Sequence, residues 1–303
     1  MRTTLIAFLL LILALLGAVV AFSSGNAATT GTGLRVVAAE NFWGSIASQL
    51  GGTRVQVTNV ITSPATDPHD YEPTAADART MAGAQMAIVN GVGYDPWAGK
   101  LLAANPVHGR VVLTVGNLVG IEPGGNPHRW YSPSDVQTVI RQITRNYTTL
   151  DPKDASYFKQ QQAHFETRAL TQYKQLLATI KHKYQGVPVG ASESIFAPLA
   201  AALGLKLVTP ASFLKAISEG TEPTASDKST IDRQIARSQI KVWVFNSQNS
   251  TPDVQRITDA ARKKRIPITT ITETLTPASA TFQSWQSRQL KALAAALAKA
   301  TGR

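Results

Sequence analysis

Apolar residues recur along the chain in short runs of strand length, and most runs are followed by a segment with helical spacing. In the first half the predicted strands lie at residues 34–39, 55–61, 86–89 and 110–115, and the predicted helices at 41–50, 74–83 and 132–150. In the second half the strands lie at residues 187–191, 205–208, 241–245 and 267–271, and the helices at 195–203, 227–237, 252–264 and 281–300. Strands that alternate with helices build a parallel sheet covered on both faces. The predicted fold class is therefore α/β, with two lobes that each hold a mostly parallel sheet flanked by helices.

The segment between the two halves keeps its helical spacing over an unusually long stretch. Asp151 and Pro152 open the segment, and apolar residues such as Phe158 and Tyr173 continue the pattern to about Tyr184. At 1.5 Å per residue such a helix is on the order of 50 Å long, which is unusual inside one compact domain. We therefore predict one long rigid helix, residues 151–185, that joins an N-terminal lobe at 34–150 to a C-terminal lobe at 186–303.

Residues 1–28 differ from everything that follows them. Arg2 precedes an apolar run at residues 5–22, and small residues follow at 25–28. This order is typical of a secretory signal peptide, and the apolar run is also long enough for an N-terminal membrane anchor. Both interpretations predict a protein that works outside the cytoplasm, in the periplasm or on the outer face of the cytoplasmic membrane, either secreted or anchored by this helix.

Composition narrows the chemistry and the partners. The 303 residues include no cysteine, which excludes disulfides, thiolate ligands and a lipid-modified cysteine, so we expect a protein that is not a lipoprotein. The formal net charge is +11, but the Lys and Arg residues are scattered. An exported protein meets little nucleic acid, so we predict no nucleic-acid partner; association with an anionic membrane surface or a wall polymer stays open.

Four side chains of metal-ligating type follow the carboxyl ends of predicted strands. His69 and His128 lie beyond the second and fourth strands of the first half, and Glu193 and Glu273 follow the first and fourth strands of the second half. Ligands of open parallel sheets bind at this edge, so a cleft between the lobes would gather all four. Imidazole and carboxylate together suit a divalent metal ion. We predict these four residues as metal ligands, and we predict no catalytic residue and no bound cofactor.

Short runs spread over the exported chain follow the order found in one protein family. They are Asn41-Phe42, Asp67-Pro68-His69-Asp70-Tyr71-Glu72-Pro73, Asn90-Gly91-Val92-Gly93, Asn126-Pro127-His128-Arg129-Trp130, Glu193-Ser194-Ile195-Phe196 and Glu219-Gly220-Thr221-Glu222-Pro223. The chain resembles the metal-binding solute receptors of bacterial ABC importers, often called the zinc/manganese cluster. The resemblance implies capture of a divalent metal ion between two lobes and its delivery to an importer permease and ATPase. We also expect a monomer.

The resemblance also assigns the metal ligands and indicates which metal ion is bound. It makes His69 and His128 the first-lobe ligands and Glu193 the third, and it puts Glu273 where the family usually has aspartate. Zinc receptors typically carry histidine at the position of Glu193, and manganese- or iron-type members carry glutamate. Carboxylates suit Mn²⁺ and Fe²⁺, whereas the general affinity order of divalent ions favours Zn²⁺. We therefore expect Mn²⁺ to be favoured, with Zn²⁺ and Fe²⁺ as alternatives.

Two other classes of function stay open. A metal-dependent hydrolase needs a coordination position that is accessible to water. The sequence has no His-Glu-x-x-His helix and no phosphate-binding glycine-rich loop, which argues against an enzyme. An adhesin or wall-binding protein would use the metal structurally and the basic surface for binding.

Overall fold

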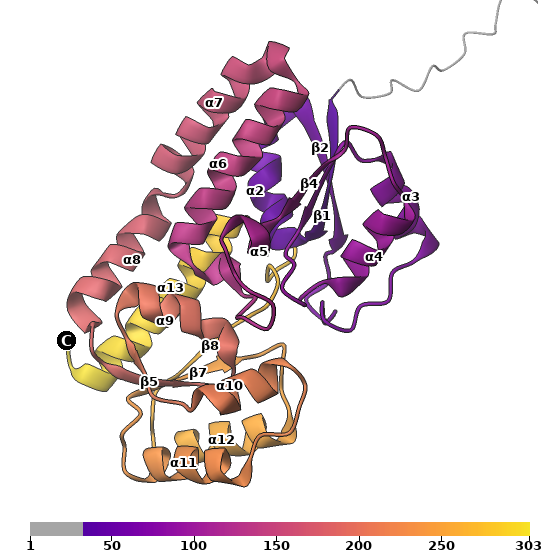
Figure 1. The fold of residues 1–303 in the computed structure, drawn as a ribbon. Helices are drawn as coiled ribbons and strands as arrows, with labels where there is room; N and C mark the ends of the chain where they lie inside the picture. The colour runs from indigo at the N-terminus through magenta and orange to yellow at the C-terminus, as the bar shows by residue number, and fades with distance from the viewer. Residues whose placement is uncertain (1–32) are drawn as a thin grey trace, which may run out of the picture. The chain divides into compact units, whose positions relative to one another are not determined.

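Two parallel β-sheets organise the described part of the chain, residues 33–303 of the computed structural model (Figure 1). The first sheet has the strand order β2-β1-β3-β4, and the second has the order β6-β5-β7-β8. The strands are β1 (Leu34–Glu40), β2 (Val55–Ile61), β3 (Met86–Val89), β4 (Val111–Thr114), β5 (Pro188–Ala191), β6 (Lys206–Leu207), β7 (Val242–Asn246) and β8 (Ile268–Ile271). Their pairings are parallel. The predicted α/β class with two mostly parallel sheets is confirmed.

Helices connect the strands and cover the sheets. The first half holds α2 (Asn41–Gly51), α3 (Ala75–Gly83), α4 (Pro96–Ala104), α5 (Val115–Leu118) and α6 (Pro133–Leu150). The second half holds α9 (Ala197–Leu203), α10 (Ala211–Ser218), α11 (Ala225–Ala236), α12 (Pro252–Lys263) and α13 (Phe282–Thr301). The sequence pattern predicted all of these except α4, α5 and α10.

Threonine side chains fix the starts of four helices. Thr74, Thr224, Thr251 and Thr281 each accept the backbone N–H of the residue three positions further on, at the starts of α3, α11, α12 and α13. At α3 and α13 the bond is reciprocal, because the side chain of that third residue accepts the backbone N–H of the threonine. Each cap satisfies a donor that the helix itself leaves free, a contribution of about 1 kcal/mol.

The segment that joins the halves is helical but not uniform. It runs through a 3₁₀ turn (Pro152–Asp154), α7 (Ala155–His164), a π-helical turn (Phe165–Ala169) and α8 (Thr171–Tyr184). In the π turn the N–H of Leu170 donates to the carbonyl of Phe165 at 2.9 Å, one residue beyond the α-helical partner. α7 packs against α6, and α8 packs against α13. The description of this segment as one rigid helix stays a prediction.

One hydrophobic core runs through both halves. It includes the inner face of α6 around Ile143 and the inner face of α13 around Leu290, together with side chains from α2 and α8. Hydrogen bonds join α2 to the start of α13, where the side chains of Gln49 and Gln283 pair and the N–H of Phe282 donates to Ser45 Oγ at 2.9 Å. The last helix therefore ties the second half back to the first, as its course in Figure 1 shows.

The helices and strands do not test two predictions, the N-terminal signal peptide or anchor and the boundaries of the two lobes. The predicted signal peptide or anchor, residues 1–28, lies outside the described residues. Within residues 33–303, no helix combines the length and the apolar character needed to cross a membrane. These residues form one compact unit, so the lobe boundaries at residues 150 and 186 stay predictions.

The shared core yields a stability prediction. Ile143 is fully buried in α6, and we expect Ile143→Ala to lower the free energy of unfolding by about 2–5 kcal/mol, because the lost methyl groups leave a cavity. Arg141→Ala, at an exposed position of the same helix, should change it by less than about 0.5 kcal/mol. Denaturant unfolding followed by circular dichroism measures both; equal effects would contradict the packing described here.

Candidate metal centre

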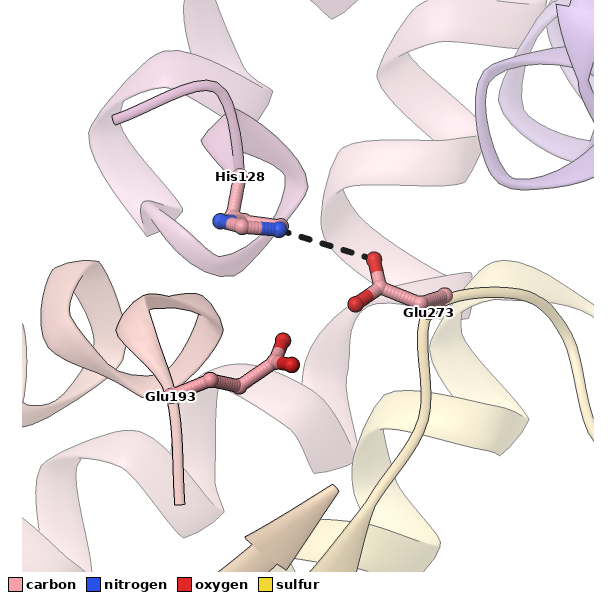
Figure 2. Close-up of side chains that lie close together, drawn as sticks. All are labelled: His128, Glu193 and Glu273. Carbon is pink, nitrogen blue, oxygen red and sulfur yellow. Dashed lines mark ion pairs between the residues drawn. The ribbon is translucent and has the colours of Figure 1, made fainter. Parts of the chain in front are cut away.

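Three of the four predicted ligands come together although they lie far apart in the sequence. His128 lies in the loop after α5, Glu193 lies two residues after β5, and Glu273 lies two residues after β8. One ligand atom from each lies within 4.8 Å of the other two, and Figure 2 shows the side chains pointing toward one another. The shortest approach between histidine and carboxylate, from His128 Nε2 to Glu273 Oε2, is 3.6 Å. The exposed fractions are 0% for His128, 1% for Glu193 and 8% for Glu273, so the group is shielded from water.

His69 lies beside this group but does not join it. Its ring centroid is 6.4 Å from that of His128 and 4.7 Å from the ring of Tyr94. It lies in the loop between β2 and α3, where its backbone N–H donates to Asp67 Oδ1 at 2.9 Å. The side chain is half-buried, in contrast to the three buried residues. The structure therefore brings together one predicted ligand of the first half and both of the second, with His69 at their margin.

Asn126 determines which nitrogen of His128 carries the proton. Asn126 Nδ2 donates to the carbonyl of Ser194 at 2.7 Å, and Asn126 Oδ1 accepts the backbone N–H of His128 at 3.0 Å, so the amide has one orientation. The same Oδ1 lies 2.9 Å from His128 Nδ1, which must then donate. Nε2 is left with its lone pair directed at the carboxylates. This nitrogen is buried and has no hydrogen-bond partner, as expected of an imidazole nitrogen that binds a metal ion.

Three polar side chains hold the two carboxylates. Asn246 Nδ2 donates to Glu193 Oε1 at 3.0 Å and to Glu273 Oε1 at 2.8 Å. Asn249 Nδ2 donates to Glu193 Oε2 at 2.6 Å, and the hydroxyl of Tyr94 donates to Glu273 Oε2 at 3.0 Å. Each oxygen therefore accepts one hydrogen bond from a neutral donor, and no cationic side chain balances the two acids among these contacts.

The charges in the site are unfavourable without a cation. Burial raises the pKa of Glu273 well above its ordinary value, and the nearby Glu193 raises it further. Burial likewise raises the pKa of Glu193. Burial also lowers the pKa of His128 well below that of a free imidazole, and His69 and Arg129 contribute in the same direction. The imidazole is therefore neutral at pH 7, and the two carboxyl groups resist ionisation until a positive charge lies between them.

Aromatic rings form a dry wall on the first-half side of the site. Trp130 is fully buried and stacks on Phe42 with ring centroids 4.0 Å apart. The ring of His128 meets Trp130 edge-on at 5.2 Å and Tyr94 at 5.8 Å. The packed rings limit rotation of the imidazole, so its position is set before any ligand arrives.

Two cavities lie beside the site, and His69 lines both. The larger has a volume of about 630 Å³ and is bordered by Asn126 and Ser194 and by apolar side chains such as Leu214. The smaller, of about 240 Å³, is bordered by Glu273. The smaller cavity therefore borders one of the buried carboxylates, with His69 on its wall.

The arrangement suits the binding of a divalent transition metal ion through one or two imidazole nitrogens and two carboxylates. Sequence reasoning did not assign roles to Asn126, Asn246, Asn249 or Tyr94. Asn126 lies within a run that the motif reading already included, and Asn246 is the residue directly after the predicted strand 241–245. Its position at a strand end was the available signal, since Glu193 and Glu273 also follow the ends of strands.

Curated relatives of the chain include metal-binding proteins. The manganese-binding lipoprotein MntA of Halalkalibacterium halodurans is 25% identical over 161 residues, which is 52% of this chain and 53% of the relative. The iron-binding protein YfeA of Yersinia pestis is 28% identical over 200 residues, 62% of each chain. The metal ABC transporter substrate-binding lipoprotein FimA of Streptococcus parasanguinis is 23% identical and covers 86% of each chain. The chain thus spans about half to three-fifths of the first two relatives and most of FimA.

Solved structures share the fold. The periplasmic zinc-binding protein TroA of Treponema pallidum superimposes with a TM-score of 0.72 at 17% identity, covering 88% of this chain and 99% of TroA. The Mn-bound S38A mutant of a periplasmic metal-binding protein from Candidatus Liberibacter asiaticus gives a TM-score of 0.74 at 20% identity, covering 87% and 99%. At these identities the likeness establishes the architecture of the two sheets and their helices.

One prediction from the sequence is wrong. The lack of cysteine led to the expectation that the protein is not a lipoprotein, but MntA, FimA and the PsaA relatives are all named as lipoproteins. A lipoprotein is held at the membrane surface by a covalently attached lipid.

A family model covers most of the chain. The ZnuA family, described as the periplasmic component A of a zinc-uptake complex, matches residues 36–296. The match extends from the first strand to the last helix and includes His69, His128, Glu193 and Glu273. The chain therefore belongs to the ZnuA family.

Proposed function

We propose that this chain captures one divalent transition metal ion at His128, Glu193 and Glu273 and delivers it to an ABC importer. The observation that carries the proposal is the buried Nε2 of His128, which has no hydrogen-bond partner and faces two buried carboxylates. A buried polar atom without a partner costs about 1–3 kcal/mol, so its retention at such a place calls for a ligand. A metal ion supplies what this nitrogen and both carboxylates lack.

Charge supports the same conclusion. Two carboxylates and a neutral imidazole carry a formal charge of −2, which a divalent cation neutralises. The alternative, protonation of the acids, is consistent with the raised pKa values of Glu193 and Glu273 in the absence of metal. Metal binding would therefore release protons from these residues, and the affinity for the metal would decrease as the pH is lowered.

His69 is the proposed fourth ligand. It lines two cavities, and its ring centroid is 6.4 Å from that of His128, so a shift of the 62–74 loop would bring it to a shared ion. The donor set would then be two imidazole nitrogens and carboxylate oxygens. This mixed set suits Mn²⁺, Fe²⁺ and Zn²⁺, the ions for which the relatives are named. A site with two carboxylates favours Mn²⁺ and Fe²⁺ more than a histidine-rich site would.

The proposed partners follow from this function. The relatives FimA and PsaA are named as substrate-binding components of ABC transporters, and we propose that the present chain acts as a monomer that docks on a permease, which an ATPase drives. Two sheet-containing lobes, residues 34–150 and 186–303, would hold the ion between them. We propose no enzymatic activity, because four protein ligands around one ion leave little room for a substrate.

Removal of a proposed ligand tests the assignment. Wild-type protein should bind one Mn²⁺ or Zn²⁺ per chain, and His128→Ala should weaken binding by more than about 100-fold, beyond the loss typical of residues outside the coordination sphere. His69→Ala should weaken it less, because this half-buried residue stands at the margin. Titration calorimetry and elemental analysis measure both. His164→Ala, at an exposed position of α7, is the matched control; unchanged binding in His128→Ala would refute the site.

The tautomer argument gives a second prediction. Asn126→Ala removes the acceptor that holds His128 Nδ1–H, and metal affinity should fall by about 10–100-fold. Asn126→Asp keeps an acceptor for both the ring and the backbone N–H, so it should restore most of the affinity. Competition titration against a chelator quantifies the series. If Asp and Ala behaved alike, the bond to Ser194 rather than the tautomer would be the contribution that matters.

A third prediction concerns stability without metal. The folded-state pKa of Glu273 is raised above 4.5, so its contribution to stability is present below about pH 4.5 and is lost as the pH rises through the folded-state pKa. Glu273→Gln cannot ionise, and its amide oxygen still accepts from Asn246. The metal-free variant should therefore be more stable than wild type, by about 1 kcal/mol or more, at the alkaline end of a scan from about pH 5 to 9.

Thermal unfolding with excess chelator across this pH range measures the difference. The exposed Glu122→Gln is the control, with no pH-dependent gain expected. Added Zn²⁺ should stabilise wild type much more than the Glu273→Gln variant. A variant that is less stable than wild type at every pH would show that the ionised carboxylate is not under strain in the metal-free protein.

A further inference from the structure

The strand order of the second sheet places one asparagine between the two glutamates. Glu193 follows β5 and Glu273 follows β8, but these strands are not neighbours, because β7 lies between them. In the sheet register Ala191 pairs with Val244 of β7, and Ile271 pairs with Asn246, the last residue of β7. Glu193 lies two residues beyond Ala191 and Glu273 two residues beyond Ile271, and the side chain of Asn246 reaches both glutamates.

Both N–H groups of the Asn246 amide are used on the glutamates. Nδ2 donates to Oε1 of Glu193 at 3.0 Å and to Oε1 of Glu273 at 2.8 Å. An amide nitrogen has two hydrogens, so its donor capacity is fully spent on the two acids. The amide oxygen accepts the backbone N–H of Gln248 at 3.0 Å, and the backbone N–H of Asn246 donates to Ser192 Oγ at 2.9 Å. The residue is fully buried, so its amide has one fixed orientation.

The other oxygen of each glutamate accepts from a different donor. Glu193 Oε2 accepts from Asn249, which is half-buried, and Glu273 Oε2 accepts from the rotatable hydroxyl of Tyr94. The Tyr94 hydroxyl can rotate and Asn249 is partly exposed, whereas the amide of Asn246 is fully buried and its oxygen is also bonded. The partial positive charge of its N–H groups lies on the Oε1 side of both carboxylates and repels a cation from that side. His128 Nε2 likewise faces Oε2 of Glu273.

We infer that Asn246 keeps Glu193 and Glu273 as single-oxygen ligands and thereby favours an ion of low coordination number; this inference rests on the proposed metal capture. With His69 and His128 the protein then supplies four ligand atoms, two nitrogens and two oxygens. Four-coordinate nitrogen/oxygen sites suit Zn²⁺, whereas Mn²⁺ prefers more oxygen ligands in an octahedral arrangement. Asn246 is thus a positioning residue that shifts the preference of a carboxylate-rich site toward Zn²⁺.

Two substitutions separate this role from a merely structural one. Asn246→Leu keeps the approximate size of the side chain and removes both donors without adding charge, and Asn246→Ala removes the side chain. Either change frees the Oε1 atoms to bind the ion as well. We expect the ratio of Mn²⁺ to Zn²⁺ affinity to rise by about tenfold relative to wild type, measured by competition titration with each ion.

Asn105→Leu is the matched control, because it removes an amide that donates only to the carbonyl of Leu101 at the end of α4. Its affinity ratio should equal that of wild type. An equal loss of affinity for both ions in the Asn246 variants would assign the residue a structural role and overturn the inference. Wild-type protein that bound neither ion would instead overturn the proposed function.

A measurement on the unaltered protein decides the matter even if neither variant folds. In crystals of wild-type protein loaded with Mn²⁺, each glutamate should contact the ion through Oε2 alone, while Oε1 stays hydrogen-bonded to Asn246. Two-oxygen contact by either glutamate would overturn the inference, although metal capture itself would stand.

Discussion

Burial of two carboxylates beside an imidazole nitrogen that has no partner is the constraint on which the rest of the site depends. Acids in a dry site repel each other strongly, since there is little water to screen them. The fold offers neutral hydrogen-bond donors from Asn246, Asn249 and Tyr94 instead of a cationic side chain. Neutral donors hold the geometry and leave the charge uncompensated. A site built in this way is stable enough to form and still gains most of its favourable electrostatic energy from the ion.

The site also depends on contacts that hold the two halves of the chain together. His128 comes from the first half and both glutamates come from the second, so their distances depend on the shared core and on the bonds between α2 and α13. Asn126 adds a local link, because one amide orients His128 and also reaches the carbonyl of Ser194, next to Glu193. The same residue therefore fixes the imidazole and couples it to the opposite half.

Sequence reasoning succeeded where a rule links position along the chain to position in space. Parallel strands bring their carboxyl ends to one edge, and this rule, together with the Pro-His motif and the family resemblance, predicted that His128, Glu193 and Glu273 lie close together, as they do. The rule does not predict how deeply a residue in the following loop is buried, and His69 lies half-buried at the margin of the site. It also does not give strand order. Nothing in the sequence pattern places β7 between β5 and β8, so the contact of Asn246 with both glutamates could not be foreseen.

Counting donor types in a sequence is therefore an incomplete guide to the preferred metal. Two glutamates contain four oxygen atoms, and a count of carboxylates treats all four as available to the ion. In the folded chain two of the four accept bonds from a fixed, buried amide, and the other two accept from the partly exposed Asn249 and from the hydroxyl of Tyr94. The number of ligand atoms is then set by a residue that never touches the metal. Receptors with the same ligand residues can differ in preference for this reason, because coordination number, rather than donor identity alone, distinguishes Zn²⁺ from Mn²⁺.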